Sequence, residues 1–341
     1  MDLYQIKTEL PIVGYCESRI GGRSENQDSY GYQDTPFGFL ITVCDGMGGG
    51  PGGKTASSIA VNEIIGGVMN GDPDNSPKNV LLKAINRANL AILDKVTETP
   101  ELKGMGTTCT AVLINDNSAI VAYVGDSRVY QLRNHHKVYR TFDHSMVFEL
   151  VKQKVITEEQ ARLSEQSNYI TRALGLKAEL EVDITELPYE KGDLFLLCTD
   201  GIHGSFPEDE LLAMVMKKGN LGQIVDDIAT AVDGNGRKKG GGHDNLTLAV
   251  IETQKNSIIK EKMNTRTKLI FAGIVALLVA SIALNITQCS SIRKIKKANE
   301  PKIVVDTTLN VSDRKDKVKT DTTTIIGTQI NNNNESKTTK K

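Results

Sequence analysis

The chain has 341 residues, 39% of them hydrophobic and 24% charged, and it carries a formal net charge of −1. This charge is unevenly distributed: residues 253–341 hold 17 Lys and Arg against 7 Asp and Glu, which leaves a net charge of −11 on residues 1–252. A domain this acidic is a poor partner for nucleic acid and a plausible host for divalent cations. The length allows one large domain or two small ones.

The cysteines and the N-terminus point to a reducing compartment. The five cysteines are scattered, odd in number and without a CxxC pair: Cys16, Cys44, Cys109, Cys198 and Cys289. We therefore expect neither a disulfide framework nor a zinc site. Met1–Gly14 contains no continuous apolar run of the kind found in a signal peptide, so the large domain is predicted to be cytoplasmic.

Apolar periodicity predicts blocks of strands and helices along residues 1–252. Strands are predicted near 10–20, 29–33 and 37–44, followed by helices over Thr55–Met69 and Lys78–Val96. The next strands are predicted over Thr107–Ile114, Ala119–Val124, Arg128–Leu132 and Lys137–Thr141. Helices over Met146–Lys154 and Thr157–Ser164, the second opened by a Thr157–Gln160 capping box, precede strands over Glu179–Leu187 and Leu194–Cys198. Helices over Glu208–Lys217 and Leu221–Val232 and a strand over Asn245–Glu252 complete the series. Such runs of strands and of helices, without strict alternation, indicate an α+β fold with largely antiparallel sheets.

A long apolar segment follows this domain. Leu269–Leu284 holds sixteen residues without a charge, near the lower limit of roughly 17 to 25 residues for a membrane-spanning helix. The predicted organisation is a globular domain over 1–253, a basic linker over 254–268, a transmembrane helix over 269–286 and a polar, disordered tail over 287–341. The protein is thus predicted to be a single-pass protein of the cell membrane. Five basic residues on each side of the apolar segment leave its orientation open, and Cys289 beyond it is a weak candidate for lipidation.

Two buried strands are predicted to end in Asp-Gly. Phe39–Cys44 leads into Asp45 and Gly46, and Leu194–Thr199 leads into Asp200 and Gly201. A carboxylate at the end of a buried strand is rigidly held at the rim of a sheet, and the glycine after it lets the backbone turn sharply. Two such sites suggest oxygen ligands that converge on a hard cation.

The glycine-rich loop after the first strand also fits a different chemistry. Gly48–Thr55 satisfies the G-x-x-x-x-G-K-[ST] pattern of a nucleotide-binding loop, and Asp200 could serve as its second acidic element. Three features argue against this reading. Asp45 would lie close to the phosphates, Pro51 removes an amide donor from the cradle, and the elements do not alternate as a parallel sheet requires.

Further acids lie beside glycines or at strand edges, and together they carry a resemblance. The motifs are Arg23–Asp28, Val43–Gly49, Gly106–Thr108, Gly125–Arg128, Asp143–Ser145, Ile170–Gly175, Cys198–Gly201 and Asp244–Asn245. In order and approximate spacing, across roughly residues 8–252, this set resembles the metal-dependent protein phosphatases, the type 2C Ser/Thr phosphatases, and most closely their bacterial members.

The resemblance implies a sandwich of two antiparallel β-sheets flanked by helices, with a two-metal site at one edge. By this resemblance, Asp45 would bridge two Mn²⁺ or Mg²⁺ ions, the Gly46 carbonyl would bind one ion, and Asp200 and Asp244 the other. Asp28 would hold metal-bound waters, Asp126 a weaker third ion, and Arg23 the substrate phosphate. The implied reaction is in-line attack on a phosphoserine or phosphothreonine by a hydroxide that bridges the ions. The implied partners are phosphoproteins of a Ser/Thr kinase pathway.

The chain departs from the family pattern at two positions. Gln27 stands where many members have Glu, which would weaken a second metal site and leaves open a catalytically weak phosphoprotein-binding scaffold. Met47 stands where some relatives have a His that acts as general acid. His144 and His243 are possible substitutes, although a lone His near a turn is more often structural. Residues 145–168 match the mobile flap of the family.

Overall fold

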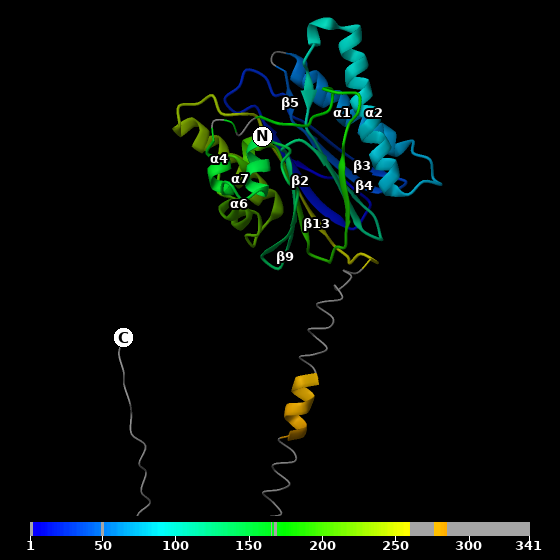
Figure 1. Ribbon diagram of the computed structural model, residues 1–341, viewed down its shortest axis with the longest axis vertical. Coiled ribbons are helices and arrows are strands. Elements are labelled where there is room, and N and C mark those ends of the chain that lie inside the picture. The colour runs from blue at the N-terminus through cyan, green and yellow to red at the C-terminus, as the bar shows by residue number, and fades with distance from the viewer. Residues whose placement is uncertain (1–2, 49–50, 165, 167–168, 260–275, 285–341) are drawn as a thin grey trace, which may run out of the picture. The chain divides into compact units, whose positions relative to one another are not determined.

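The computed structural model describes residues 3–48, 51–164, 166, 169–259 and 276–284 (Figure 1). The chain divides into two units, Met1–Met263 and Asn264–Lys341. The strands and the helices α1 to α7 all belong to the first unit, and the fold described below is that of this unit alone.

Two antiparallel sheets form the centre of this unit. The first sheet has six strands in the order β1 (Leu3–Gln5), β2 (Ile12–Arg19), β13 (Leu246–Thr253), β12 (Leu194–Cys198), β9 (Arg128–Arg133) and β10 (His136–Arg140). The second has five strands in the order β11 (Asp183–Leu187), β8 (Ala119–Val124), β7 (Cys109–Ile114), β4 (Gly38–Cys44) and β3 (Ser29–Thr35). A separate two-stranded ribbon pairs β5 (Gly46–Met47) with β6 (Gly106–Thr107). The predicted α+β fold with antiparallel sheets is confirmed.

Helices cover the outer faces of both sheets (Figure 1). The helices are α1 (Pro51–Met69), α2 (Pro77–Glu98), α3 (Met146–Lys152), α4 (Glu158–Arg162), α5 (Asp200–His203), α6 (Glu208–Val215) and α7 (Leu221–Lys238). Apolar side chains of α1 and α2 pack on the second sheet, and those of α5, α6 and α7 pack on the first. A third apolar cluster, which includes Phe39, Ile41, Phe195 and Leu197, fills the space between the two sheets. Three packed layers of side chains therefore hold the strands rigidly in place.

Local sequence explains where the helices begin. Ser76 caps α2 by accepting a hydrogen bond from the Asn79 amide, and Pro77 occupies the first helical position. In α4 the Thr157 side chain bonds the Gln160 amide and the Gln160 side chain bonds the Thr157 amide. The predicted capping box at this helix is confirmed.

Several element boundaries differ from the predictions. Helix α1 begins at Pro51, four residues early, because Gly52 and Gly53 adopt helical backbone despite their low helix propensity. Helix α7 continues through Gly234 and Gly236 to Lys238, since its buried face outweighs the cost of these glycines. Strand β11 begins only at Asp183, and the short helix α5 directly after β12 was not predicted.

The predicted transmembrane helix and the membrane localisation are wrong. Among the described residues there is no helix with the length and apolar character needed to cross a membrane. Within the predicted span, the structure describes a helix over 276–284, which rises about 14 Å against the roughly 30 Å of a hydrocarbon core. The rest of 269–286, most of the linker over 254–268, Cys289 and the tail over 287–341 lie outside the described residues.

Candidate metal centre

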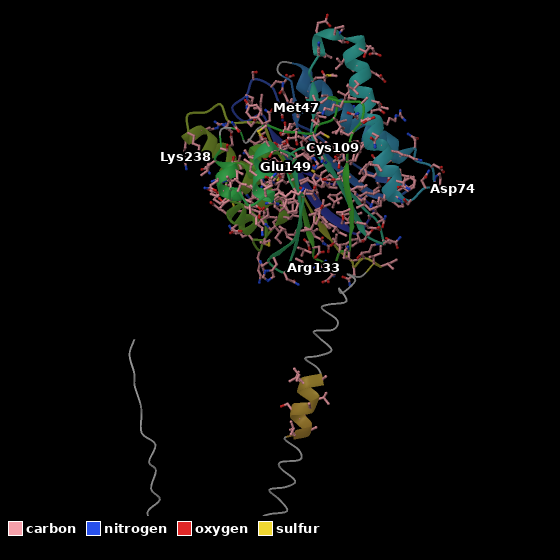
Figure 2. All side chains as sticks on the ribbon, in the orientation of Figure 1. Met47, Asp74, Cys109, Arg133, Glu149 and Lys238 are labelled. Carbon is pink, nitrogen blue, oxygen red and sulfur yellow. The ribbon has the colours of Figure 1, made fainter. Side chains whose placement is uncertain are left out.

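Four of the predicted metal-ligand carboxylates line one pocket at an end of the sandwich. The pocket has a volume of about 380 Å³, and Arg23, Gln27, Gly46 and Met47 also line it. Its acids follow or precede strands: Asp45 follows β4, Asp126 and Asp200 lie two residues beyond β8 and β12, and Asp244 lies two residues before β13. Met47 lies near one end of the domain and Arg133 near the other (Figure 2).

The Asp45 backbone is fixed by two threonines, Thr107 at the end of β6 and Thr108 directly before β7. The Asp45 amide donates to Thr108 Oγ1 at 2.9 Å, while its carbonyl accepts from the Thr108 amide and the Thr107 hydroxyl, both at 2.8 Å. The Thr108 hydroxyl also bonds Ser127 at 2.7 Å, in the turn that carries Asp126. These contacts position the Asp45 carboxylate without using it, so that it remains available for a ligand.

The glycines after Asp45 and Asp200 are required by close approach of the backbone. A Cβ atom on Gly46 would lie 2.1 Å from the Gly53 carbonyl oxygen, and one on Gly201 would lie 1.9 Å from the Asn245 carbonyl oxygen. Neither glycine has a positive φ, so the expected sharp turn is not what selects them. Any side chain here would push apart the segments that carry the acids.

Asp28 lies just behind the pocket and is 2% exposed. Its carboxylate accepts a hydrogen bond of 3.0 Å from the Thr199 hydroxyl, and its carbonyl accepts one of 2.8 Å from Lys54 Nζ. Lys54, the lysine of the nucleotide-loop pattern, also contacts Ser29 Oγ at 3.2 Å. Since α1 already begins at Pro51, Gly52 and Gly53 lie in a helix rather than in a phosphate cradle. The geometry and the antiparallel sheets therefore argue against a nucleotide site.

The gathered carboxylates disfavour one another's ionisation. Burial, and then the charges of Asp200 and Asp244, raise the pKa of Asp28 to about 7. Burial and the charge of Asp244 raise the pKa of Asp200 to about 6. Burial and neighbouring acids raise the pKa values of Asp45 and Asp126 well above the usual range of a carboxyl. Bound cations would relieve this repulsion.

The donor set fits hard cations such as Mg²⁺ or Mn²⁺. Buried oxygens Asp28 Oδ1 and Asp200 Oδ1 have no hydrogen-bond partner, which is costly unless a ligand satisfies them. In the part of the chain that the structure describes, no group of three or more His, Cys, Asp or Glu side chains is arranged so that it could by itself hold a metal ion. The carboxylates instead surround a cavity. This arrangement suits Mg²⁺, which keeps several of its waters and binds proteins through one or two carboxylates.

Arg23 and Asp244 lie at the rim of the pocket. Arg23 contacts the Asp244 carboxylate at 2.8 Å, and both side chains are partly exposed. The adjacent Asn245 side chain bonds the Gln27 amide and the carbonyls of Ile20 and Glu25. It thereby joins the loop that carries Arg23 to the turn that carries Asp244.

The two histidines considered as general acids have other partners. His144 accepts from the Gly125 amide through Nδ1 at 3.1 Å and contacts Asp183 through Nε2 at 2.8 Å. His243 Nε2 contacts Asp233 at 2.8 Å. Neither lines the pocket, and each joins separate segments of the chain. A structural role therefore explains both.

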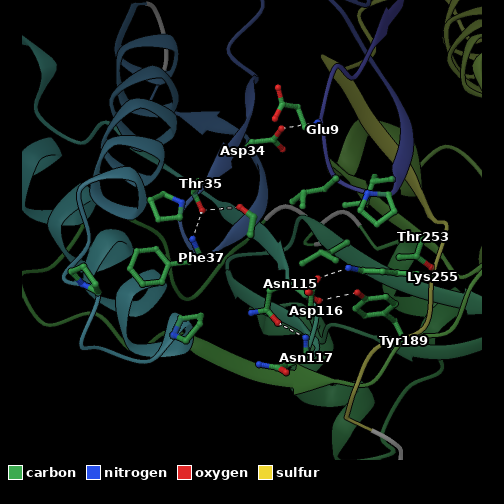
Figure 3. Close-up of a pocket in the computed structure, with 18 of the residues that line it drawn as sticks. Glu9, Asp34, Thr35, Phe37, Asn115, Asp116, Asn117, Tyr189, Thr253 and Lys255 are labelled. Carbon is green, nitrogen blue, oxygen red and sulfur yellow. Dashed lines mark hydrogen bonds and ion pairs between the residues drawn. The ribbon is translucent and has the colours of Figure 1, made fainter.

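A larger pocket of about 570 Å³ lies at the opposite ends of the strands (Figure 3). Two of its acids are already engaged: Asp34 accepts from Thr8 and from the Glu9 amide, and Asp116 pairs with Lys255. The cluster of buried, mutually repelling carboxylates lies instead at the smaller pocket. The acids that could bind cations therefore lie at the end of the sheets that carries Asp45.

Comparison with known proteins places this chain in one family. A family profile described as Protein phosphatase 2C matches residues 17–238. The chain belongs to the protein phosphatase 2C family. This membership confirms the predicted class of enzyme, a protein phosphatase.

This phosphatase matches bacterial relatives over nearly the whole length of the relatives. It is 32% identical over 257 residues to the serine/threonine phosphatase stp of Listeria monocytogenes, covering 74% of this chain and 97% of that protein. It is 31% identical in sequence to the solved serine/threonine phosphatase of S. agalactiae, with a TM-score of 0.64, covering 71% of this chain and 99% of that one. The catalytic domain of the phosphatase PstP, solved in complex with 2 manganese ions, is 29% identical, with a TM-score of 0.59 and coverage of 71% and 97%.

The sequence did not reveal the residues that hold the predicted ligands of this phosphatase in place. Thr108, Thr199, Lys54 and Asn245 each fix the backbone or carboxylate of a neighbouring acid or its loop. Thr108, Thr199 and Asn245 lie within motifs that the sequence revealed, but none of the three received a role. Lys54 could be assigned only from its contacts. Its side chain reaches the Asp28 carbonyl and the hydroxyl of Ser29, the first residue of β3.

Proposed function

We propose that this protein is a metal-dependent phosphatase that hydrolyses phosphoserine and phosphothreonine in proteins. The observation that carries the proposal is the cluster of buried carboxylates at the strand ends, with two unpartnered oxygens and raised pKa values. The relatives named serine/threonine phosphatases, and the manganese in PstP, support the same assignment. The substrates would be phosphoproteins made by Ser/Thr kinases.

The residues have separate roles in this proposal. Asp45, at the centre of the cluster, would hold both of two Mn²⁺ or Mg²⁺ ions, helped by the Gly46 carbonyl. Asp200 and Asp244 would bind one of the ions, while Asp28 would orient water and Asp126 would hold a weaker third ion. When bound, the ions supply the positive charge that makes a water molecule acidic and that neutralises the phosphate oxygens.

Arg23 would bind the substrate phosphate. Its guanidinium lies at the rim of the pocket, partly exposed, and contacts Asp244. Cations near Asp244 would weaken this ion pair, and the planar fork of Arg23 could then contact two phosphate oxygens. Met47, which also lines the pocket, has no titratable group and cannot supply the proton for the leaving alkoxide, a role that we assign to water.

The full chain and a phosphothreonine peptide test this function. We expect phosphate release with Mn²⁺, none with chelator, and loss of the activity in Asp45→Asn. Binding of the phosphopeptide without hydrolysis under any metal condition would instead establish the scaffold suggested by Gln27. ATP hydrolysis that depends on Lys54 would overturn the assignment in favour of a nucleotide-binding protein.

A further inference from the structure

The turn that carries Asp126 is held from several sides. It joins β8 to β9, and Gly125 has a φ of +105°. The Gly125 amide donates to His144 Nδ1, and its carbonyl accepts from the His144 amide at 2.9 Å. Ser127 contacts the hydroxyl of Thr108. The carbonyl of Asp126 itself also has a partner in the described structure.

His203 supplies the partner of that carbonyl. Its Nε2 lies 3.0 Å from the Asp126 carbonyl oxygen, and both residues are more than nine-tenths buried. A carbonyl can only accept a hydrogen bond, so Nε2 must carry the proton. The contact spans 77 positions in the chain.

This bond ties two of the proposed ligands to each other. His203 is the last residue of α5, and Asp200 is the first, so the imidazole lies one helical turn from the Asp200 carboxylate. Asp126 and Asp200 also line a second small cavity, of about 70 Å³, together with His203. A neutral N–H donor fixes the Asp126 peptide without adding positive charge that would compete with a cation.

The nearest cation to this turn is already engaged elsewhere. Arg128 makes a bidentate ion pair with Asp143, at 2.8 and 2.7 Å, and lies over the ring of Phe148. Its remaining nitrogen donates to the Tyr130 hydroxyl. Among the described residues, His203 therefore contacts Asp126 from the helix that carries Asp200, whereas the guanidinium of Arg128 is bound to Asp143 and Tyr130.

We propose that His203 is a positioning residue that holds Asp126 at a fixed distance from Asp200, and so sets the affinity of the metal ion bound at Asp126. This inference rests on the proposed function. The role lies in the N–H of the imidazole rather than in its bulk. Loss of that N–H should weaken the weakest metal-binding step and leave the Asp45 centre intact.

A matched pair of variants separates the N–H from the bulk. Gln and Met are similar in length, but only Gln has an N–H near the place of Nε2, so His203→Gln and His203→Met are compared in the full chain. His136→Met, on an exposed part of β10, is the control substitution. Mn²⁺ binding is measured by isothermal titration calorimetry after chelator treatment, beside the Mn²⁺ dependence of phosphopeptide turnover and the melting temperature.

We expect His203→Met to weaken the weakest Mn²⁺-binding step about tenfold, the loss of about 1.4 kcal/mol, with turnover at saturating Mn²⁺ little changed. His203→Gln should restore most of the affinity. Equal weakening in both variants, or wild-type Mn²⁺ binding in His203→Met, would overturn the proposal. In an Asp126→Asn background, His203→Met should have no further effect on Mn²⁺ binding, and an additional loss there would also contradict it. If the wild type binds Mn²⁺ but releases no phosphate, the proposed function fails while calorimetry still decides the role of His203.

Discussion

The Thr199 hydroxyl donates a hydrogen bond of 3.0 Å to the Asp28 carboxylate, and so joins two segments that lie 171 positions apart in the chain. The same hydroxyl oxygen accepts from the Thr247 amide at 3.1 Å, in strand β13. One side chain thus connects the loop before β3, the end of β12 and the start of β13. All three segments carry proposed metal ligands.

Replacing Thr199 with Val should therefore affect both stability and metal binding. The shape is nearly unchanged, but the buried Thr247 amide and one Asp28 oxygen each lose a hydrogen bond, which costs about 1–3 kcal/mol. Urea unfolding with and without Mn²⁺ measures this cost. Thr185→Val, on the edge strand β11, is the control and should change stability little. A wild-type unfolding curve for Thr199→Val would contradict the role of the hydroxyl.

Asp45→Asn should separate stability from activity. The substitution puts a permanently neutral side chain in place of a buried carboxyl whose ionisation burial and the neighbouring acids disfavour, so the ion-free protein should melt at the same temperature as the wild type or higher. Activity should fall about 10³-fold, because metal assistance is worth several kcal/mol. Calorimetry and phosphopeptide turnover check the two effects. A fall in the melting temperature without loss of turnover would exclude Asp45 as the central ligand.

Mn²⁺ should stabilise the protein more at pH 8 than at pH 5.5. The folded pKa values of Asp28 and Asp200, about 7 and about 6, lie above the ordinary value of 3.8. The ion-free folded state therefore holds protons that the unfolded chain has released, and the stability linked to them is lost as the pH rises through 6 to 7. Cations replace those protons. The measurement is the shift in melting temperature on adding Mn²⁺ at each pH, and equal shifts would contradict this coupling.

Lys54→Met should leave most of the phosphatase activity in place. Lys54 Nζ contacts the Asp28 carbonyl and Ser29 Oγ, so its loss should slow turnover by about tenfold at most, the equivalent of one or two hydrogen bonds. No ATP hydrolysis is expected in either protein. Turnover of phosphopeptide and of ATP by wild type and variant decides the question.

Two glycine substitutions should have opposite effects on stability. In Gly201→Ala the new methyl group would lie 1.9 Å from the Asn245 carbonyl oxygen, which should cost about 1–3 kcal/mol or more. In Gly234→Ala the methyl group would meet no atom within 4 Å, and the higher helix propensity of Ala in α7 should stabilise the protein by about 0.5–1 kcal/mol. Chemical denaturation of both variants measures the difference. Stabilisation by Gly201→Ala would show that this close approach is absent in solution.

The sequence predicted strands β4 and β12 well because their apolar runs are buried on both faces. Strands β4 and β12 were predicted to within one residue, and each precedes one of the Asp-Gly pairs. The acids at the strand ends were therefore found from the sequence, and the structure gathers Asp45, Asp126, Asp200 and Asp244 around one pocket. Their role as ligands remains a prediction.

Contacts between segments that are distant in the chain could not be predicted from the sequence. The bonds of Thr199 to Asp28 and of His203 to Asp126 depend on how the two sheets are packed, which no local pattern encodes. Helix α5 has four residues, too few for a periodic signal. The membrane span predicted over 269–286 was wrong for a related reason, since an apolar run alone does not establish a spanning helix.

The last strand of the domain, β13, lies between β2 and β12 in the middle of the first sheet. During synthesis, the first sheet therefore remains divided until residue 253 has left the ribosome, because its central strand is missing. Asp244 arrives with that same strand, so a growing chain holds its other acids but not the complete set. A chain interrupted before residue 244 would be unable to form the centre, and catalytic competence would begin only when the whole domain has been made.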